Sequence, residues 1–451
     1  MNSEKQYIDL YNQNRELICS HSNDVMNSKR DEAFEAFSRN GFPSKKVERY
    51  KYTDVQALFA PEDYGLNLNR VKFPINPSDI FTCDVPNMST SLYFVINDMF
   101  YERANTCDTL PEGVYIGSLS EAVEKYPEII EKYYGRLAYP EEDAITALNT
   151  MLAQDGLVVY IPKGVKVDQT IQVINVMHSN VDLMINRRVL IIVEPRAEVK
   201  LLFCDHNADK QRFLTTQVIE AFVEDDAHLE LYCLEETHRK NVRFSNLYID
   251  QQRSSFVNHN AITLHNGVTR NKTDLVFSGE GSECELLGCV IADKTQHVDN
   301  NTLIDHKVGH CTSEELYKYV LDDQAVGAFA GKVLVRHDAQ QTLSHETNQN
   351  LCAPKEARMY TQPMLEIYAD DVKCDHGSTV GQLNDAALFY MQQRGISLKE
   401  ARMLLKFAFL GQVIDHIKLE PLRNRLHLLV EKRFRGELAG CRTCHKCSKS
   451  E

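Results

Sequence analysis

The sequence contains no tryptophan and no long apolar segment. No run approaches the roughly 18 apolar residues of a membrane-spanning helix, so we expect no contact with a membrane. The first residues, MNSEKQYIDLYNQNRELICS, are polar and mixed in charge, unlike a secretory signal peptide. These absences predict a cytoplasmic protein.

Familiar catalytic motifs are also missing. The segment GAFAGKV at 327–333 resembles a phosphate-binding loop, but it has three residues between its glycines instead of four. Val333 follows Lys332 at the position where Ser or Thr must reach magnesium. There is no Rossmann glycine fingerprint, G-x-S-x-G elbow or H-E-x-x-H helix. The interpretation as a nucleotide-hydrolysing P-loop protein therefore fails.

Positive charge is in the minority. The chain has 50 Lys and Arg against 64 Asp and Glu, a net charge of -14. An acidic chain repels a phosphate backbone unless it gathers a basic face. Nucleic acid is therefore not an expected partner.

The chain divides into regions that differ in predicted secondary structure. We expect an N-terminal helical domain at 1–90, which includes a helix through KRDEAFEAFSRN that is capped by Ser28 and stopped by Gly41. A mixed segment at 91–155 leads into a β-rich core at 156–380. A helical domain at 381–438 and a Cys-rich flexible tail at 439–451 complete the chain.

A degenerate repeat runs through the β-rich core. VEPRAEVKL, VEDDAHLEL, IDQQRSSFV, FSGEGSECEL and IDHKVGHCT begin at 193, 223, 249, 277 and 304, in steps of 30, 26, 28 and 27 residues. Each reads as a strand end, a polar turn and a new strand, which predicts a stacked solenoid of the β-helix type. A Greek-key sandwich is the weaker alternative.

Three helices follow the core. Asn384 caps the first and Gly395 ends it, Ser397 and Glu400 form a capping box for the second, and Pro421 starts the third. We expect Ala401, Leu404, Leu405 and Ala408 to form one apolar face of the second helix, and Leu422, Leu426, Leu429 and Val430 one of the third. Residues 397–436 carry nine Lys or Arg and four Asp or Glu, a difference of +5. That charge suits either docking to an acidic partner or a solvated cap on the solenoid end.

The thirteen cysteines are scattered except at the C-terminus, as in proteins of a reducing compartment. Cys441, Cys444 and His445 spell the haem c pattern C-x-x-C-H, which belongs to exported proteins. Cys441, Cys444 and Cys447 resemble part of a ferredoxin motif that lacks its fourth cysteine and its proline. The tail is either a flexible thiol segment that binds soft metals weakly or a true zinc or iron site.

Cys374 and His376 lie two residues apart where the β-rich core gives way to helices. On a strand, residues i and i+2 share a face, so both side chains can reach one zinc or iron ion. Two ligands do not close such a site, and a buried cysteine beside a hydrogen-bonded histidine is the competing interpretation. His306, His310 and Cys311 have the spacing of solenoid turn residues.

The segment LEIYADDVKCDHGSTVGQLNDAALFYMQQRGIS resembles the SufB/SufD family of the SUF iron–sulfur cluster assembly system. The likeness continues in NTLIDHKVGHCTSEELYK, GKVLVRHDAQQT, NTMLAQDGLVVYIPKGV and GFPSKKVERYKYTDV, where Tyr50 replaces the usual Trp. DDVKCDHG and DHKVGHCTS follow the SufD form. Departures are Asp375 for a common Ser, Ala330 for Asn and Cys352 for Leu.

This resemblance implies a right-handed parallel β-helix flanked by helical domains. It also implies a non-catalytic scaffold that pairs with a SufB-like β-helix subunit and binds a SufC-like ABC ATPase through its C-terminal helices. The isolated chain could form a homodimer. In the family the position of His376, with Cys374 beside it, faces the SufB partner, so an iron–sulfur cluster would assemble there transiently and none would stay bound.

Two rival functions remain open from the sequence. One is a self-contained metal or iron–sulfur protein that uses the C-terminal cysteines. The other is a carbohydrate-active β-helix enzyme, which the lack of tryptophan and of an export signal disfavours.

Overall fold

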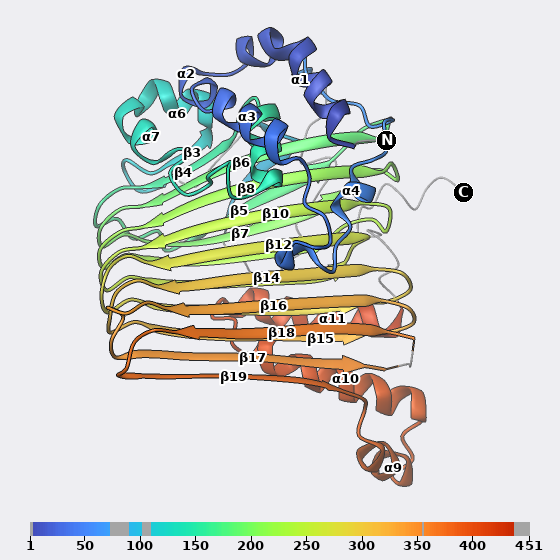
Figure 1. Ribbon diagram of the computed structural model, residues 1–451. Coiled ribbons are helices and arrows are strands. Elements are labelled where there is room, and N and C mark those ends of the chain that lie inside the picture. The colour runs from blue at the N-terminus through green and yellow to red at the C-terminus, as the bar shows by residue number, and fades with distance from the viewer. Residues whose placement is uncertain (1–2, 73–89, 102–109, 354–355, 437–451) are drawn as a thin grey trace.

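Two parallel β-sheets coil around one interior. The computed structural model describes residues 3–72, 90–101, 110–353 and 356–436. Over these ranges the chain forms a right-handed parallel β-helix of about seven turns, with helices from both ends of the chain packed on it (Figure 1). The mainly β prediction is confirmed. The Greek-key alternative is wrong, because neighbouring strands of successive coils run parallel.

Strands alternate between a front sheet, nearer the viewer in Figure 1, and a rear sheet. Counted over the described ranges, the front sheet has nine strands: β3 Tyr115–Ser118, β4 Leu157–Ile161, β6 Leu183–Val193, β8 Phe213–Val223, β10 Val242–Gln251, β12 Val268–Phe277, β14 His297–His306, β16 Val326–Val335 and β18 Arg358–Ile367. The rear sheet has ten: β2 Met99–Tyr101, β1 Thr90–Ile96, β5 Thr170–Met177, β7 Glu198–Asn207, β9 His228–Glu236, β11 Phe256–His265, β13 Glu283–Ala292, β15 Thr312–Leu321, β17 Thr342–Cys352 and β19 Val372–Gly381.

The repeat seen in the sequence is the turn from the front sheet to the rear sheet. The turns from β4–β5 to β16–β17 each have one residue with positive φ at the same place: Gly164, Arg196, Asp226, Ser254, Gly281, His310 and Gln341. The N–H of such a residue bonds the carbonyl group of the next coil, as from Arg196 to Asp225 at 2.9 Å. The turns therefore stack, which fixes the coil length although the residues vary.

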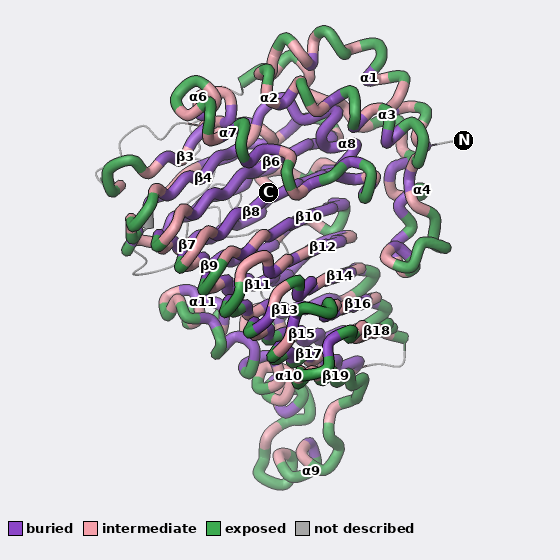
Figure 2. Tube along the Cα trace, turned by 60° about the vertical axis from the view of Figure 1, so that its left-hand side comes forward, coloured by how far each residue is buried: buried purple, intermediate pink, exposed green. Residues whose placement is uncertain are grey.

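The interior of the β-helix holds its main apolar core. Inward side chains of both sheets form one cluster that runs from Val95 to Val372. The inner strands are mostly buried, whereas β18 is mostly half-buried and β19, the last strand, is largely exposed (Figure 2). That end of the interior is therefore open.

The N-terminal helices cover the outer face of the front sheet. They are α1 Ser3–Ser20, α2 Asp24–Asn27, α3 Arg30–Asn40, the 3-10 helix Glu48–Tyr50, α4 Val55–Leu58, α6 Leu119–Lys125, α7 Pro127–Tyr133 and α8 Ala144–Leu152. Gly41 ends α3 as predicted, with φ 59°. The prediction that Ser28 caps α3 is wrong: Ser28 ends α2, and its hydroxyl group donates to the carbonyl group of Val25.

After the β-helix come α9 Asp385–Gln393, α10 Leu398–Ile414 and α11 Glu420–Arg435. α10 and α11 lie against the outer face of the rear sheet, whereas α9 projects beyond the last coil (Figure 1). The predicted apolar face of α11 is confirmed, since Leu422, Leu426, Leu429 and Val430 are all buried there.

For α10 the predicted face is wrong. Leu404 and Ala408 are exposed, while Leu410, Val413 and Ile414 meet the sheet. Within the first half of α10, Ala401 of the predicted face is buried together with Met403, at 0% and 8% exposed. The physical reason is that packing against α11 and the rear sheet covers another face of the helix, which leaves Leu404 and Ala408 outside.

Candidate functional site

Cys374 and His376 lie on β19, the last strand of the rear sheet. β19 pairs in parallel with β17 along one edge, and no described strand pairs with its other edge. Cys374 stands opposite Ser344, and His376 stands opposite Glu346. The pair is thus at the free end of the β-helix.

Both side chains face the interior of the last coil. Cys374 is half-buried and packs against the interior apolar core. His376 is exposed, and the alternation of a strand turns it to the same face as Cys374. Two residues further, Ser378 meets Thr361 of β18 across the interior, with 2.7 Å between their hydroxyl oxygens. Cys374 and His376 therefore do share one face of the strand, as predicted, and they lie at the open end of the β-helix interior.

The surroundings of the Cys374 thiol raise its pKa. Burial is the largest cause that raises its pKa, and the charge of Asp375 adds to the rise, while a backbone hydrogen bond from Ser344 opposes it. The thiol therefore stays protonated at neutral pH and must lose that proton before it binds a metal.

The side chain of Asp375 does not face the interior with Cys374 and His376. This residue stands where Ser is common in the family that the sequence resembles. It lies between Cys374 and His376, so its side chain points to the outer face of the rear sheet. There it forms an ion pair with His345, whose Nε2 lies 3.0 Å from the hydroxyl group of Thr347. Its charge is engaged on the outer face.

A line of hydrogen bonds leads inward below Cys374. His306 Nε2 lies 3.0 Å from the hydroxyl group of Ser313, which donates to that of Ser344 at 2.8 Å. Burial lowers the pKa of His306 to about 4, so this ring is neutral. The sequence did predict His306, His310 and Cys311 as turn residues: His306 ends β14, His310 takes the positive φ of the turn, and Cys311 is buried beside it.

No group of three His, Cys, Asp or Glu side chains that could hold a metal ion occurs among the described residues. Cys374 and His376 therefore provide half of a metal site at most. The tail cysteines Cys441, Cys444 and Cys447 lie outside the described residues, so their metal binding stays a hypothesis. The segment that resembles a phosphate loop lies within strand β16 and forms no loop.

Sequence reasoning missed two buried carboxylic acids near this end, Glu315 on β15 and Glu346 on β17. Only the coil register shows that they stand opposite each other and that Glu346 is opposite His376. If the coils were aligned with one another beforehand, the inward positions of these two acids could be recognised from the sequence. Without that alignment, the sequence does not distinguish them from surface residues.

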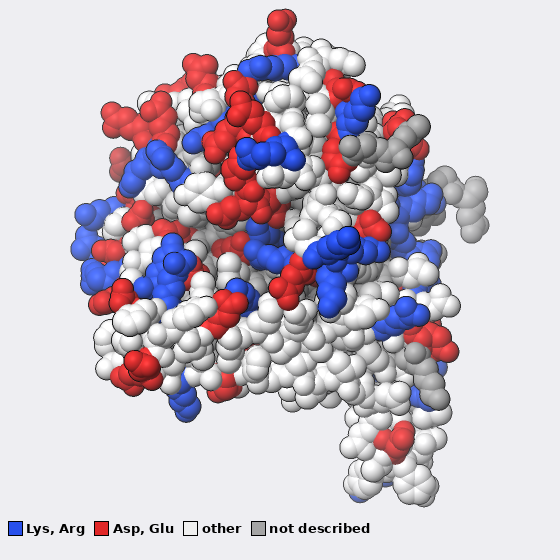
Figure 3. All heavy atoms as spheres, viewed as in Figure 1, with Lys and Arg blue, Asp and Glu red and all other residues white. Residues whose placement is uncertain are grey.

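A second exposed feature is apolar and lies on α9 and the first half of α10. We call Phe389, Tyr390, Leu398 and Leu404 the α9–α10 apolar surface; their exposures are 64%, 58%, 39% and 37%. In the view of Figure 3 the projecting lobe at this end carries few charged side chains. A contiguous exposed surface of this kind marks an interaction site more often than a scattered residue does.

Several basic residues of the C-terminal helical domain form ion pairs with acidic residues of the β-helix. Lys406 pairs with Asp322 at 2.6 Å, and Lys418 pairs with Glu285 at 3.2 Å. Arg433 reaches Asp293, a carboxylate near the rear sheet, at 2.7 Å. These contacts hold α10 and α11 on the side of the β-helix, so the two helices do not cap its end.

In the described ranges no helix is long and apolar enough to cross a membrane.

Comparison with known proteins gives two family matches. Residues 1–173 match the SufBD protein N-terminal region, and residues 175–409 match the SufBD core domain of SUF system FeS cluster assembly.

Curated relatives agree over most of the chain. An iron–sulfur cluster assembly SufBD family protein of Synechocystis is 26% identical over 92% of this chain and 93% of its own. The iron–sulfur cluster assembly protein SufD of Escherichia coli is 26% identical over 88% and 90%, and that of Bacillus subtilis is 23% identical over 78% and 81%. The predicted likeness to SufD is confirmed, and the chain belongs to the SufBD family of iron–sulfur cluster assembly proteins.

Proposed function

We propose that the protein is a non-catalytic scaffold subunit of a SUF-type iron–sulfur cluster assembly complex. The observation that carries this proposal is the place of Cys374 and His376, on a strand whose outer edge has no described neighbour. A thiol and an imidazole on one face supply two of the ligands that an iron centre needs. A second chain that adds its own strand beside β18 and β19 would bring the others.

The partner at this end would be a second β-helix chain, of the SufB kind. The backbone groups along the free edges of β18 and β19 support this pairing, since an open parallel edge is a template for another strand. Exposed apolar side chains also lie there, with Tyr368 at 62% and Val380 at 51%. A second copy of this chain could use the same edge, which would give a homodimer when the partner is absent.

The α9–α10 apolar surface would bind an ABC ATPase of the SufC kind. Helix α9 begins four residues after β19 ends, so a partner that moves α9 would pull directly on the strand that carries Cys374 and His376. ATP-driven dimerisation of two such ATPases would draw together the C-terminal helices of both β-helix subunits. The last coils would shift and expose their ligands to iron and sulfide.

No cluster would stay bound to the isolated chain, because half a site binds weakly. Assembly in the cytoplasm suits the eight cysteines that the structure describes, all of which are free thiols.

A tagged pull-down under anaerobic conditions tests the complex. We expect an ABC ATPase and a second β-helix chain to copurify, and recovery of this chain alone would refute the scaffold proposal. Cluster assembly by the recovered complex then tests the site. His376→Ala should lower the yield of assembled cluster, whereas His337→Ala, at an exposed turn of the same end, should not. Equal yields for the two variants would remove His376 from the site.

A further inference from the structure

Two buried carboxylic acids stand inside the β-helix, one and two strands below His376. Glu315 and Glu346 are only 2% and 0% exposed, and they are direct register partners on β15 and β17. Adjacent strands lie about 4.8 Å apart, so the two carboxyl groups are neighbours. The Glu346 carboxyl group reaches across to β16, where a Cβ on Gly331 would lie 2.2 Å from its Oε1. Only glycine leaves room for the carboxyl group there.

Among the described residues, neither acid has a hydrogen-bond partner of ordinary geometry. All four carboxyl oxygens are buried without a hydrogen bond, and so is the hydroxyl oxygen of Thr302 on β14. Thr302 is the register neighbour of Gly331, and its hydroxyl group lies beside the Glu315 carboxyl group without the geometry of an ordinary hydrogen bond. Five unsatisfied oxygens therefore meet in one part of the interior.

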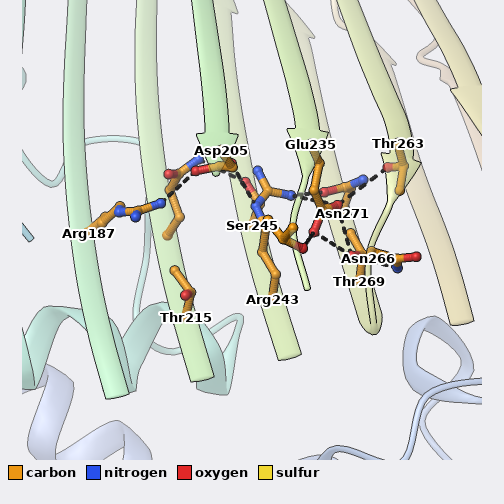
Figure 4. A network of polar contacts seen from close by, with 12 residues as sticks. Arg187, Asp205, Thr215, Glu235, Arg243, Ser245, Thr263, Asn266, Thr269 and Asn271 are labelled. Atoms are coloured by element: carbon orange, nitrogen blue, oxygen red, sulfur yellow. Dashed lines mark hydrogen bonds and ion pairs between the residues drawn. The ribbon is translucent and has the colours of Figure 1, made fainter. Parts of the chain in front are cut away.

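The rest of the interior shows that this is unusual. Nearer the N-terminal coils, Asp205 takes ion pairs from Arg187 at 2.6 Å and from Arg243 at 3.0 Å (Figure 4). Glu235 accepts hydrogen bonds from Thr269 at 2.8 and 2.9 Å and lies 4.0 Å from Arg243. Buried acids in those coils have cationic or hydroxyl partners, as buried charges normally require.

An unpaired buried carboxyl group has two ways to avoid its desolvation cost. It can keep its proton, and burial does raise the pKa of both acids, with the charge of Glu315 raising that of Glu346 further. It can instead exchange the proton for a cation, which removes the repulsion between two carboxylates as well. Two carboxylates and a hydroxyl group form an all-oxygen donor set, which suits a hard divalent cation that keeps some water ligands.

We propose that Glu315 and Glu346, with the Thr302 hydroxyl group, form an internal site for a divalent cation of the Fe²⁺ and Mn²⁺ class. Binding replaces the protons on the two carboxyl groups by one M²⁺ ion and its remaining water ligands, with no change of oxidation state. The ion enters through the open end, past His376. The inference rests on the proposed function only for its role, which is to hold ferrous ion one strand below the Cys374–His376 pair.

Mn²⁺ is a suitable probe, because the electron paramagnetic resonance signal of the free ion disappears when it binds. The full-length chain, alone and without its partners, is titrated with Mn²⁺ at neutral pH, and Fe²⁺ is added anaerobically as competitor. We expect one Mn²⁺ per chain, displaced by Fe²⁺. Glu346→Gln and Thr302→Val should each weaken binding, the first by more than about tenfold. Two variants guard against the failure of one to fold.

Glu314→Gln is the matched control, since Glu314 precedes Glu315 on β15 and is exposed on the outer face. It should bind Mn²⁺ as the parent chain does. Absence of stoichiometric binding, or equal weakening by Glu314→Gln and Glu346→Gln, would overturn the inference. Such a result would leave the scaffold proposal intact, because copurification of partners does not depend on Mn²⁺. Conversely, if the chain binds Mn²⁺ in this titration but copurifies with no partner in the pull-down, this site would be supported and the scaffold proposal refuted.

Discussion

Removal of the Phe389 side chain should weaken binding of the proposed ATPase partner. Phe389 is 64% exposed on α9. A phenylalanine has about 200 Å² of accessible surface, so a partner could bury about 130 Å² of it. At about 25 cal/mol per Å², that area stabilises the complex by about 3 kcal/mol. Phe389→Ala should therefore weaken the binding of the ATPase by about 100-fold.

Isothermal titration of the purified ATPase into this chain measures the effect. Tyr139→Ala is the control, since Tyr139 is 50% exposed but lies before α8, at the other end of the molecule. Neither substitution should change the thermal unfolding temperature, because neither side chain belongs to a core. If the two variants bind the ATPase with equal affinity, the α9–α10 apolar surface is not the docking surface.

Three further predictions concern stability. Glu220→Ala leaves the buried Arg188 without its partner at 2.5 Å, and should lower the free energy of unfolding by about 3–5 kcal/mol in denaturant titration. Burial lowers the pKa of His306 from 6.5 to about 4. Between pH 6.5 and about pH 4, the imidazole is therefore protonated in the unfolded chain but neutral in the native chain. Stability should therefore fall by about 3 kcal/mol as pH drops from about 6.5 to about 4, and thermal unfolding of His306→Gln should lack that part of the fall. Arg433→Leu removes the bond to Asp293, and hydrogen exchange should become faster in α11 while the β-helix strands keep their protection.

The sequence predicted the β-helix because the turns repeat. Residues as different as Arg196, Asp226 and His310 occupy the same left-handed turn position, so no single motif marks it. The spacing of 26–30 residues between repeats persisted because every coil must match the length of its neighbours. Helix capping was predicted well at Asn384, whose side chain accepts hydrogen bonds from two backbone N–H groups, since capping is a local interaction.

The apolar face of α10 could not be predicted in the same way. Leu404 and Leu410 are alike in the sequence, yet Leu404 is exposed at 37% and Leu410 is fully buried. What separates them is the face of the helix: Met403, directly before Leu404, is buried as Leu410 is. Packing against α11 and the rear sheet decides which face of α10 is covered, and both contacts are tertiary.

The sequence by itself determined the coil repeat, the shared face of Cys374 and His376, and the order of the helices that follow, because each depends on residues near one another in the chain. Tertiary structure alone decided that this pair stands at an open end, that Asp375 turns to His345, and that Glu315 and Glu346 meet across two coils. Register between strands 30 residues apart creates those contacts. Desolvation, which gives them their chemistry, exists only once the coils have closed around them.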